Sequence, residues 1–159
     1  MGSRLSSALV QAELLEVKAL KSALARQAIL GGSLDTILLE KGMVDESGLC
    51  TLLCHVSGIP CLEPGLLGML GPLDEVPISL ERARELEACP MDCDGEDMIL
   101  LVSETADDIS LKDLATEVDR TLHLFIAPDL RVNQARSLVY GEELDKRYLK
   151  LLEAYGDDI

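Results

Sequence analysis

The chain has 159 residues, 48% of them hydrophobic, which is enough to bury a core and argues against a disordered chain. Its formal net charge is −15, and residues 61–159 alone carry nine Lys/Arg against 23 Asp/Glu. A field of this sign repels a nucleic-acid backbone, so we expect no DNA or RNA partner. No apolar run approaches the ~18–20 residues that cross a bilayer, so we expect no membrane insertion.

The first 60 residues contain two copies of one helical unit, offset by 29 positions. Five apolar pairs coincide at this offset, namely Leu5/Leu34, Leu9/Leu38, Leu15/Val44, Leu20/Leu49 and Leu24/Leu53. A repeat of this period indicates units that bury their apolar faces against each other. The repeat leaves two roles open: a site for a ligand with two similar halves, or a small bundle without a ligand.

Apolar residues at helical spacing predict helices over 5–12 and 16–29 in the first copy. In the second copy, Ser33 is suited to cap a helix that stops at Gly42, and Asp45 is suited to cap a longer helix. Each copy is therefore a short helix, a break and a longer helix.

After residue 60 the pattern changes from purely helical to mixed. The sequence predicts, in chain order, a helix capped by Ser79, a turn over 92–95, a buried strand over 98–102, a helix capped by Asp108 or Ser110, a strand over 122–127, a helix from Pro128 to 139 and a last helix over 142–155. The whole is an α+β fold in four parts: a helical tandem-repeat subdomain (1–60), a Pro/Gly connector (61–78), a small α/β subdomain (79–141) and a C-terminal helix with a frayed tail (142–159).

Four side chains crowd together and raise the question of a metal site: Cys50, Cys54, His55 and Cys61. Zinc sites show close ligand pairs separated by a longer loop, whereas His55 is turned about 100° from the helical face that Cys50 and Cys54 share. We therefore expect reduced thiols and no metal site. His123 lies in a predicted strand without a Ser or Cys partner and an orienting acid, so we expect no catalytic residues and no enzyme.

Three passages carry a resemblance to a known family. The first spans 4–27, with Arg-Leu, spaced leucines, Ala-Leu and a closing Gln; the second spans 34–60, with Glu-Lys-Gly-Met-Val at 40–44 and Ser-Gly-Ile-Pro at 57–60; the third spans 88–102 and is followed by 124–128 and 138–141. Over about residues 4–141, the chain resembles the N-terminal domain of the assembly ATPases of type II secretion and type IV pili.

In that family the domain precedes a P-loop ATPase, but this sequence holds no Gly-x-x-x-x-Gly-Lys-Ser/Thr stretch. The resemblance implies a non-catalytic, cytoplasmic, bacterial regulatory domain. Some domains of the family bind cyclic di-GMP across the two helical copies, and others only contact partner proteins. Docking on a protein component of a secretion or pilus system is our leading hypothesis, and a cyclic di-GMP sensor with a partly eroded site is the alternative.

The resemblance also implies where the ligand would bind. Arg4 and Gln27 stand at the family's Arg and Gln positions, and Gly42 keeps the glycine of the break. The apolar floor of the site would be formed by Leu5, Leu9, Leu34 and Leu38. The second copy departs from the family pattern at Ser33, Asp35 and Val56. Asp35 replaces a glycine and would place a negative charge near an anionic ligand.

Overall fold

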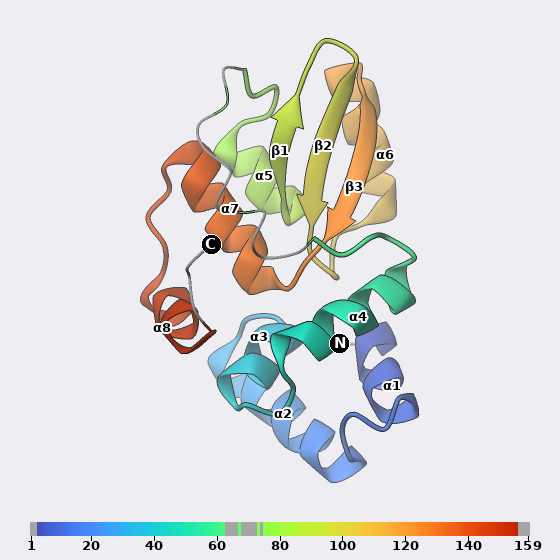
Figure 1. The fold of residues 1–159 in the computed structure, drawn as a ribbon, viewed down its shortest axis with the longest axis vertical. Helices are drawn as coiled ribbons and strands as arrows, with labels where there is room; N and C mark the ends of the chain where they lie inside the picture. The colour runs from blue at the N-terminus through green and yellow to red at the C-terminus, as the bar shows by residue number, and fades with distance from the viewer. Residues whose placement is uncertain (1–2, 63–66, 68–72, 74, 156–159) are drawn as a thin grey trace.

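The structure is a computed structural model that describes residues 3–62, 67, 73 and 75–155. Over these residues the chain forms α1 (Ser3–Gln11), α2 (Val17–Leu30), α3 (Leu34–Glu40), α4 (Glu46–Ser57), α5 (Leu80–Leu86), β1 (Ala88–Cys93), β2 (Asp97–Val102), α6 (Asp108–Val118), β3 (Thr121–Ile126), α7 (Asp129–Tyr140) and α8 (Lys146–Tyr155). The predicted α+β class is confirmed. In Figure 1, α1–α4 lie below the sheet; we call them the helical half, and α5–α7 with the strands the sheet half. None of the described helices is long and apolar enough to pass through a bilayer.

In the helical half, two helices start at the predicted caps. The Ser33 Oγ accepts a hydrogen bond from the Thr36 amide at 3.4 Å, and the Asp45 Oδ1 accepts one from the Gly48 amide at 2.7 Å. These bonds satisfy amide groups that the start of a helix leaves unpaired. The predicted caps of α3 and α4 are therefore confirmed.

The two copies of the repeat also match in backbone shape at their breaks. Gly42 has a φ of +64°, and Glu13, at the matching position of the first copy, has a φ of +58°. A residue with a side chain adopts this left-handed conformation at a cost of roughly 1–2 kcal/mol, which glycine does not incur. The first copy therefore keeps the turn although it has lost the glycine.

Leucines from both copies lie in one hydrophobic core. The repeat contributes to it Leu5, Leu9, Leu20, Leu34, Leu38, Leu49 and Leu53. The same core continues into the sheet half through Met98, Leu100 and Val102 of β2. The helical half therefore shares its interior with the sheet half.

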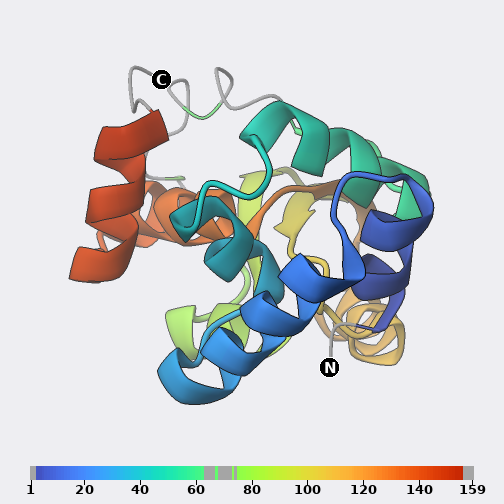
Figure 2. The ribbon, with the colours of Figure 1, turned by 90° about the horizontal axis from the view of Figure 1, so that it is seen from below.

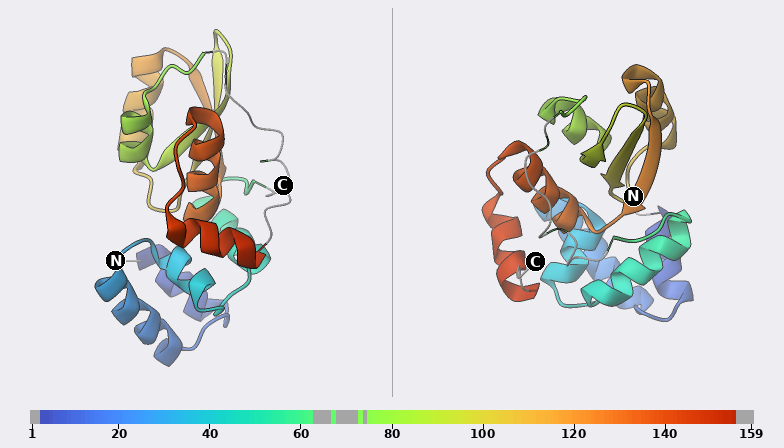
Figure 3. Two further views of the ribbon diagram at one scale, coloured as in Figure 1. Left: turned by 90° about the vertical axis from the view of Figure 1, so that its left-hand side faces the viewer. Right: turned by 45° about the horizontal axis from the view of Figure 1, so that its top comes forward.

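The strands lie in the order β1-β2-β3, with β1 antiparallel and β3 parallel to β2. The parallel pair needs a crossover connection, which α6 supplies. Side chains of β2 alternate between two clusters: Leu100 packs with residues of α5 and α6, and Leu101 packs with residues of α7. Helices α5 and α6 thus cover one face of the sheet, as Figure 3 shows, and α7 covers the other.

Strand β1 corrects the prediction of a turn over 92–95, because the strand runs into that segment. The turn lies one step later, where the Asp94 Oδ1 accepts hydrogen bonds from the amides of Glu96 and Asp97, both at 2.8 Å. Pro90 makes β1 a poor strand by local preference, and proline is tolerated in a sheet only at an edge. Pairing with β2 therefore creates this strand.

Helix α6 is capped by Asp107, whose Oδ2 accepts a hydrogen bond from the Ser110 amide at 3.0 Å, and neither predicted cap, Asp108 or Ser110, has this role. Most of the predicted connector at 61–78, and all of the predicted frayed tail at 156–159, lie outside the described residues. The four-part division of the chain stays a prediction.

Candidate functional site

The leucines of the predicted ligand site lie inside the protein. The following four side chains are at most 4% exposed: Leu5, Leu9, Leu34 and Leu38. Gln27 donates a hydrogen bond from Nε2 to the Gly32 carbonyl oxygen at 3.0 Å, across the turn between α2 and α3. Arg4 lies on α1, but its side chain is outside the described part of the structure. The structure thus places Gln27 at the junction of the two copies and the four leucines in the interior.

Asp35, the acidic residue at a glycine position of the family pattern, is buried. Its side chain is only 2% exposed, and its Oδ2 accepts a hydrogen bond from the Asp129 amide at the start of α7 at 3.2 Å. The Ser33 hydroxyl donates to its other oxygen. Burial, and then the negative charge of Asp129, raise the pKa of Asp35 from 3.8 to about 7. This carboxyl therefore joins the helical half to α7.

A buried ion pair makes a second junction with α7. Arg131 donates from Nε and Nη2 to the two carboxylate oxygens of Glu46 on α4, at 2.7 and 2.8 Å. The two side chains are 3% and 12% exposed. From α8, the Tyr148 hydroxyl donates to Asp129 Oδ2 at 2.7 Å. We call Asp35, Glu46, Asp129, Arg131 and Tyr148 the α7 seam, since they tie α7 to α3, α4 and α8.

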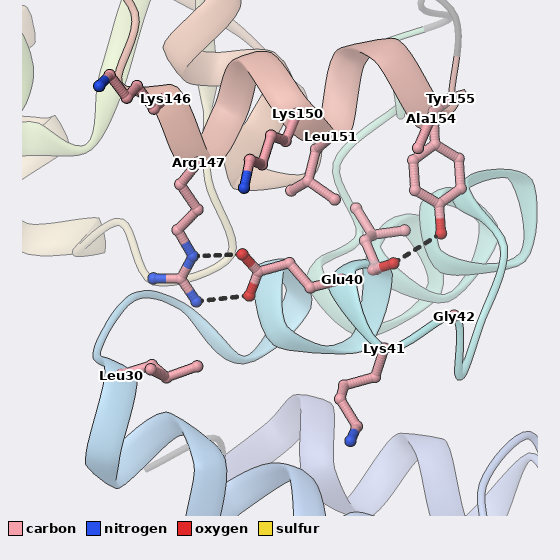
Figure 4. Close-up of a pocket in the computed structure, with 11 residues that line it drawn as sticks. Leu30, Glu40, Lys41, Gly42, Lys146, Arg147, Lys150, Leu151, Ala154 and Tyr155 are labelled. Atoms are coloured by element: carbon pink, nitrogen blue, oxygen red, sulfur yellow. Dashed lines mark hydrogen bonds and ion pairs between the residues drawn. The ribbon is translucent and has the colours of Figure 1, made fainter.

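A pocket of about 940 Å³ opens between the C-terminal end of α3 and helix α8 (Figure 4). We call it the α3–α8 pocket, and it is lined by Leu30, Leu39, Glu40, Lys41, Gly42, Lys146, Arg147, Lys150, Leu151, Ala154 and Tyr155. Arg147 donates from Nε and Nη2 to both carboxylate oxygens of Glu40, at 2.6 and 2.7 Å. The Tyr155 hydroxyl donates to the Leu39 carbonyl oxygen at 2.9 Å. These contacts fix α8 against α3, and Gly42 is the one predicted site residue in the lining.

A glycine makes room for the arginine of this pocket. Arg147 Nη1 donates to the Gly31 carbonyl oxygen at 3.0 Å. A Cβ atom on the next residue, Gly32, would lie 2.6 Å from Arg147 Nη1, and Gly32 has a φ of +89°. Glycine meets both demands, the close approach and the left-handed backbone. A side chain at position 32 would therefore displace the guanidinium group of Arg147.

The α3–α8 pocket is cationic, although the whole chain carries a charge of −15. Arg147 and Glu40 neutralise each other, which leaves Lys41, Lys146 and Lys150, three of the six lysines in the sequence. Across the described part of the chain, none of these three lysines has a carboxylate within ion-pair distance. Among the described residues, the pocket thus holds three lysines that form no ion pair.

Sequence reasoning missed this pocket because most of its basic residues, Lys146, Arg147 and Lys150, lie on α8, beyond the span of the family resemblance. Glu40 and Arg147 are 107 positions apart, so no local pattern connects them. One signal was available: Lys146 and Lys150 are four residues apart and therefore share a face of the predicted last helix.

The cysteines of α4 border a separate cavity of about 690 Å³. Cys50, Cys54 and Cys61 line it, and all five cysteines of the chain are free thiols. A hydrogen bond with Cys61, and then burial, raise the pKa of Cys50, which makes it a poor nucleophile at neutral pH. Within the described residues, no three His, Cys, Asp or Glu side chains are grouped to hold a metal. His123 lies in a strand, as predicted; its side chain is exposed, and its Nε2 lies 2.8 Å from Asp97 Oδ1.

Comparison with known proteins agrees with the resemblance seen in the sequence. No protein-family model matches the chain. Over 113 residues the chain is 31% identical to the type IV pilus assembly ATPase PilB of Thermus thermophilus. The matched segment covers 70% of this chain but only 13% of PilB. The structure of MshE with cdg (cyclic di-GMP) matches 96% of this chain and 99% of that chain, with a TM-score of 0.57 and 23% identity. The N-terminal domain of XpsE matches 87% of this chain and 95% of that one, with a TM-score of 0.62 and 21% identity. In sequence and in fold, the chain thus resembles the N-terminal domain of the type II secretion and type IV pilus assembly ATPases.

Proposed function

We propose that this chain is a non-catalytic regulatory domain that acts in the cytoplasm and docks on a protein component of a type II secretion or type IV pilus system. The observation that carries the proposal is the likeness to the N-terminal domain of XpsE, which extends over nearly all of both chains. A fold alone does not identify a partner, so the docking surface has to be argued from this chain's own residues.

Helix α2 offers the best docking surface. Seven large hydrophobic side chains are exposed in the described part of the chain, and four belong to α2 or the turn before it: Leu14, Val17, Ile29 and Leu30. The helix also carries Lys18, Lys21 and Arg26 and no acidic residue. Figure 2 shows α2 on the outer side of the helical half. Exposed apolar and basic side chains on an acidic protein favour a partner whose surface is apolar and acidic.

The substitution Ile29→Asp tests this docking surface. Ile29 is 82% exposed, so the change should leave the fold intact while it removes an apolar contact and adds a repelling charge. After crosslinking in cells that contain a secretion or pilus system, we expect the tagged variant to recover the machinery's components about tenfold less than the wild type. Recovery would be quantified by mass spectrometry.

Ile109→Asp on α6 is the matched control, since Ile109 is 69% exposed and lies on a helix of the sheet half. It should recover the components as the wild type does. Equal recovery by all three proteins would remove α2 from the proposal, and failure of the wild type to recover any component would contradict the docking function itself.

Cyclic di-GMP binding is a second candidate function, supported by the likeness to MshE with cdg. The proposed residues are those of the repeat: Arg4, Leu5, Leu9, Gln27, Leu34, Leu38 and Gly42. Calorimetric titration should give micromolar binding that Arg4→Ala abolishes, because a guanidinium can stack on guanine and pair with phosphate. Arg26→Ala on the exposed face of α2 should bind as the wild type does. An absence of heat at high micromolar ligand would exclude this function.

A further inference from the structure

We propose that the α3–α8 pocket binds a small phosphate-bearing molecule of about nucleotide size, with Lys41, Lys146 and Lys150 meeting its negative charges. The inference does not rest on either function proposed above. The two sites share Gly42, but the charges of the pocket come from α8 and the end of α3, whereas the polar contacts of the cyclic di-GMP site are Arg4 and Gln27.

The arrangement of charge favours an anion. Three ammonium groups around one pocket repel one another, and a bound anion relieves that repulsion. In Figure 4, Lys150 points from α8 toward α3, whereas Lys41 points away from α8 at the end of α3 and Lys146 points outward at the rim. A lysine ammonium is a point charge on a flexible stem, so it can follow a phosphate group into the pocket. Salt screens charges beyond about 8–10 Å, so the distant acidic surface does not cancel the local positive field.

The carboxylate in the lining does not compete for the lysines. Both oxygens of Glu40 are bound by Arg147. Lys146 also borders a neighbouring hollow whose lining includes acidic side chains. An anion in the α3–α8 pocket therefore meets Lys150 most directly, and Lys41 has to turn its flexible side chain to reach it.

The remainder of the lining suits the uncharged part of such a ligand. Leu30, Leu39, Leu151 and Ala154 contribute apolar surface, and the Tyr155 ring is held in place by its hydroxyl bond to the main chain. A pocket of about 940 Å³ is far larger than inorganic phosphate requires. Small-molecule sites span roughly 300–1,000 Å³, which accommodates a phosphorylated molecule with a ring system.

Isothermal titration at low salt with ADP, pyrophosphate and adenosine tests the proposal. We expect ADP to bind, pyrophosphate to bind more weakly, and uncharged adenosine not to bind. The double variant Lys41→Gln/Lys150→Gln should weaken ADP binding at least tenfold. The double variant Lys18→Gln/Lys21→Gln on α2 changes the net charge by the same amount and should bind ADP as the wild type does. All four lysines are exposed, so folding should be unaffected.

Amide NMR spectra locate the ligand independently of the variants. Shifts on ADP addition that are confined to 39–42 and 146–155 support the proposal, and shifts that fall only elsewhere overturn it. Three titration results also overturn it: no binding of ADP or pyrophosphate at millimolar concentration, adenosine binding as tight as ADP binding, or equal weakening by the two double variants. None of these results depends on whether cyclic di-GMP binds or whether α2 docks a partner.

Discussion

Replacing Arg131 with Met should lower the free energy of unfolding by about 3–5 kcal/mol, because the change leaves the Glu46 carboxylate in a largely buried place without its cation. Arg131 holds both oxygens of Glu46, so a methionine of similar length restores the packing but none of the charge. Urea denaturation followed by circular dichroism measures the loss.

Two further variants show whether the loss of stability comes from breaking the buried ion pair or from the removal of any arginine. Arg82→Met removes the pair between Arg82 and Glu117, whose side chains are 29% and 50% exposed, and should cost less than about 1 kcal/mol. The double variant Arg131→Met/Glu46→Leu should recover most of the loss, since the Glu46 carboxylate is then removed together with its cation. If Arg131→Met were as mild as Arg82→Met, the pair would not hold the α7 seam together.

Replacing Asp35 with Asn should stabilise the protein at pH 8 and remove a pH dependence that the wild type shows between pH 4 and 7. The pKa of Asp35 rises from 3.8 in the unfolded chain to about 7 in the folded protein, so folding favours the protonated form. The folded state therefore binds more protons between these values, and stability falls as pH rises from about 4 to 7 and is constant above. A difference of about 3 units corresponds to roughly 4 kcal/mol at most, and we expect a gain of about 2–4 kcal/mol at pH 8.

Asparagine can keep the hydrogen-bond geometry of Asp35, because its amide oxygen accepts from the Asp129 amide and its nitrogen donates to the Ser33 hydroxyl. Thermal or urea unfolding at several pH values measures the profile. Asp108→Asn, at an exposed position in the first turn of α6, should keep the wild-type profile. A decline between pH 4 and 7 that survives in Asp35→Asn would assign it to another group.

The parts of the fold that the sequence predicted correctly are those that local chemistry determines. Ser33 and Asp45 cap helices because each side chain reaches an amide three residues ahead. The apolar run of β2 is recognisable because it is buried. Strand β1 was missed because Pro90 argues against a strand, and only its partner β2 stabilises the pairing.

The candidate site was less predictable, because its contacts join distant parts of the chain. Nothing in the sequence indicated that Asp35 is buried or that it accepts a hydrogen bond from the amide of Asp129, 94 positions later. The α3–α8 pocket depends on α8, for which the resemblance gave no guidance, and on the close approach of Arg147 to Gly32. The repeat predicted which leucines are alike, and the structure adds that they belong to one hydrophobic core.

We expect that the two copies of the repeat do not fold on their own. Two of their carboxyl groups have hydrogen-bond partners on α7. Asp35 accepts from the amide of Asp129, 94 positions later, and Glu46 accepts from Arg131, 85 positions later. If the repeat were grafted into another protein, both carboxyl groups would lack these partners, and the leucines that share a core with β2 would be exposed to solvent. Chimeras built from this protein therefore have to transplant the repeat and α7 as one inseparable unit.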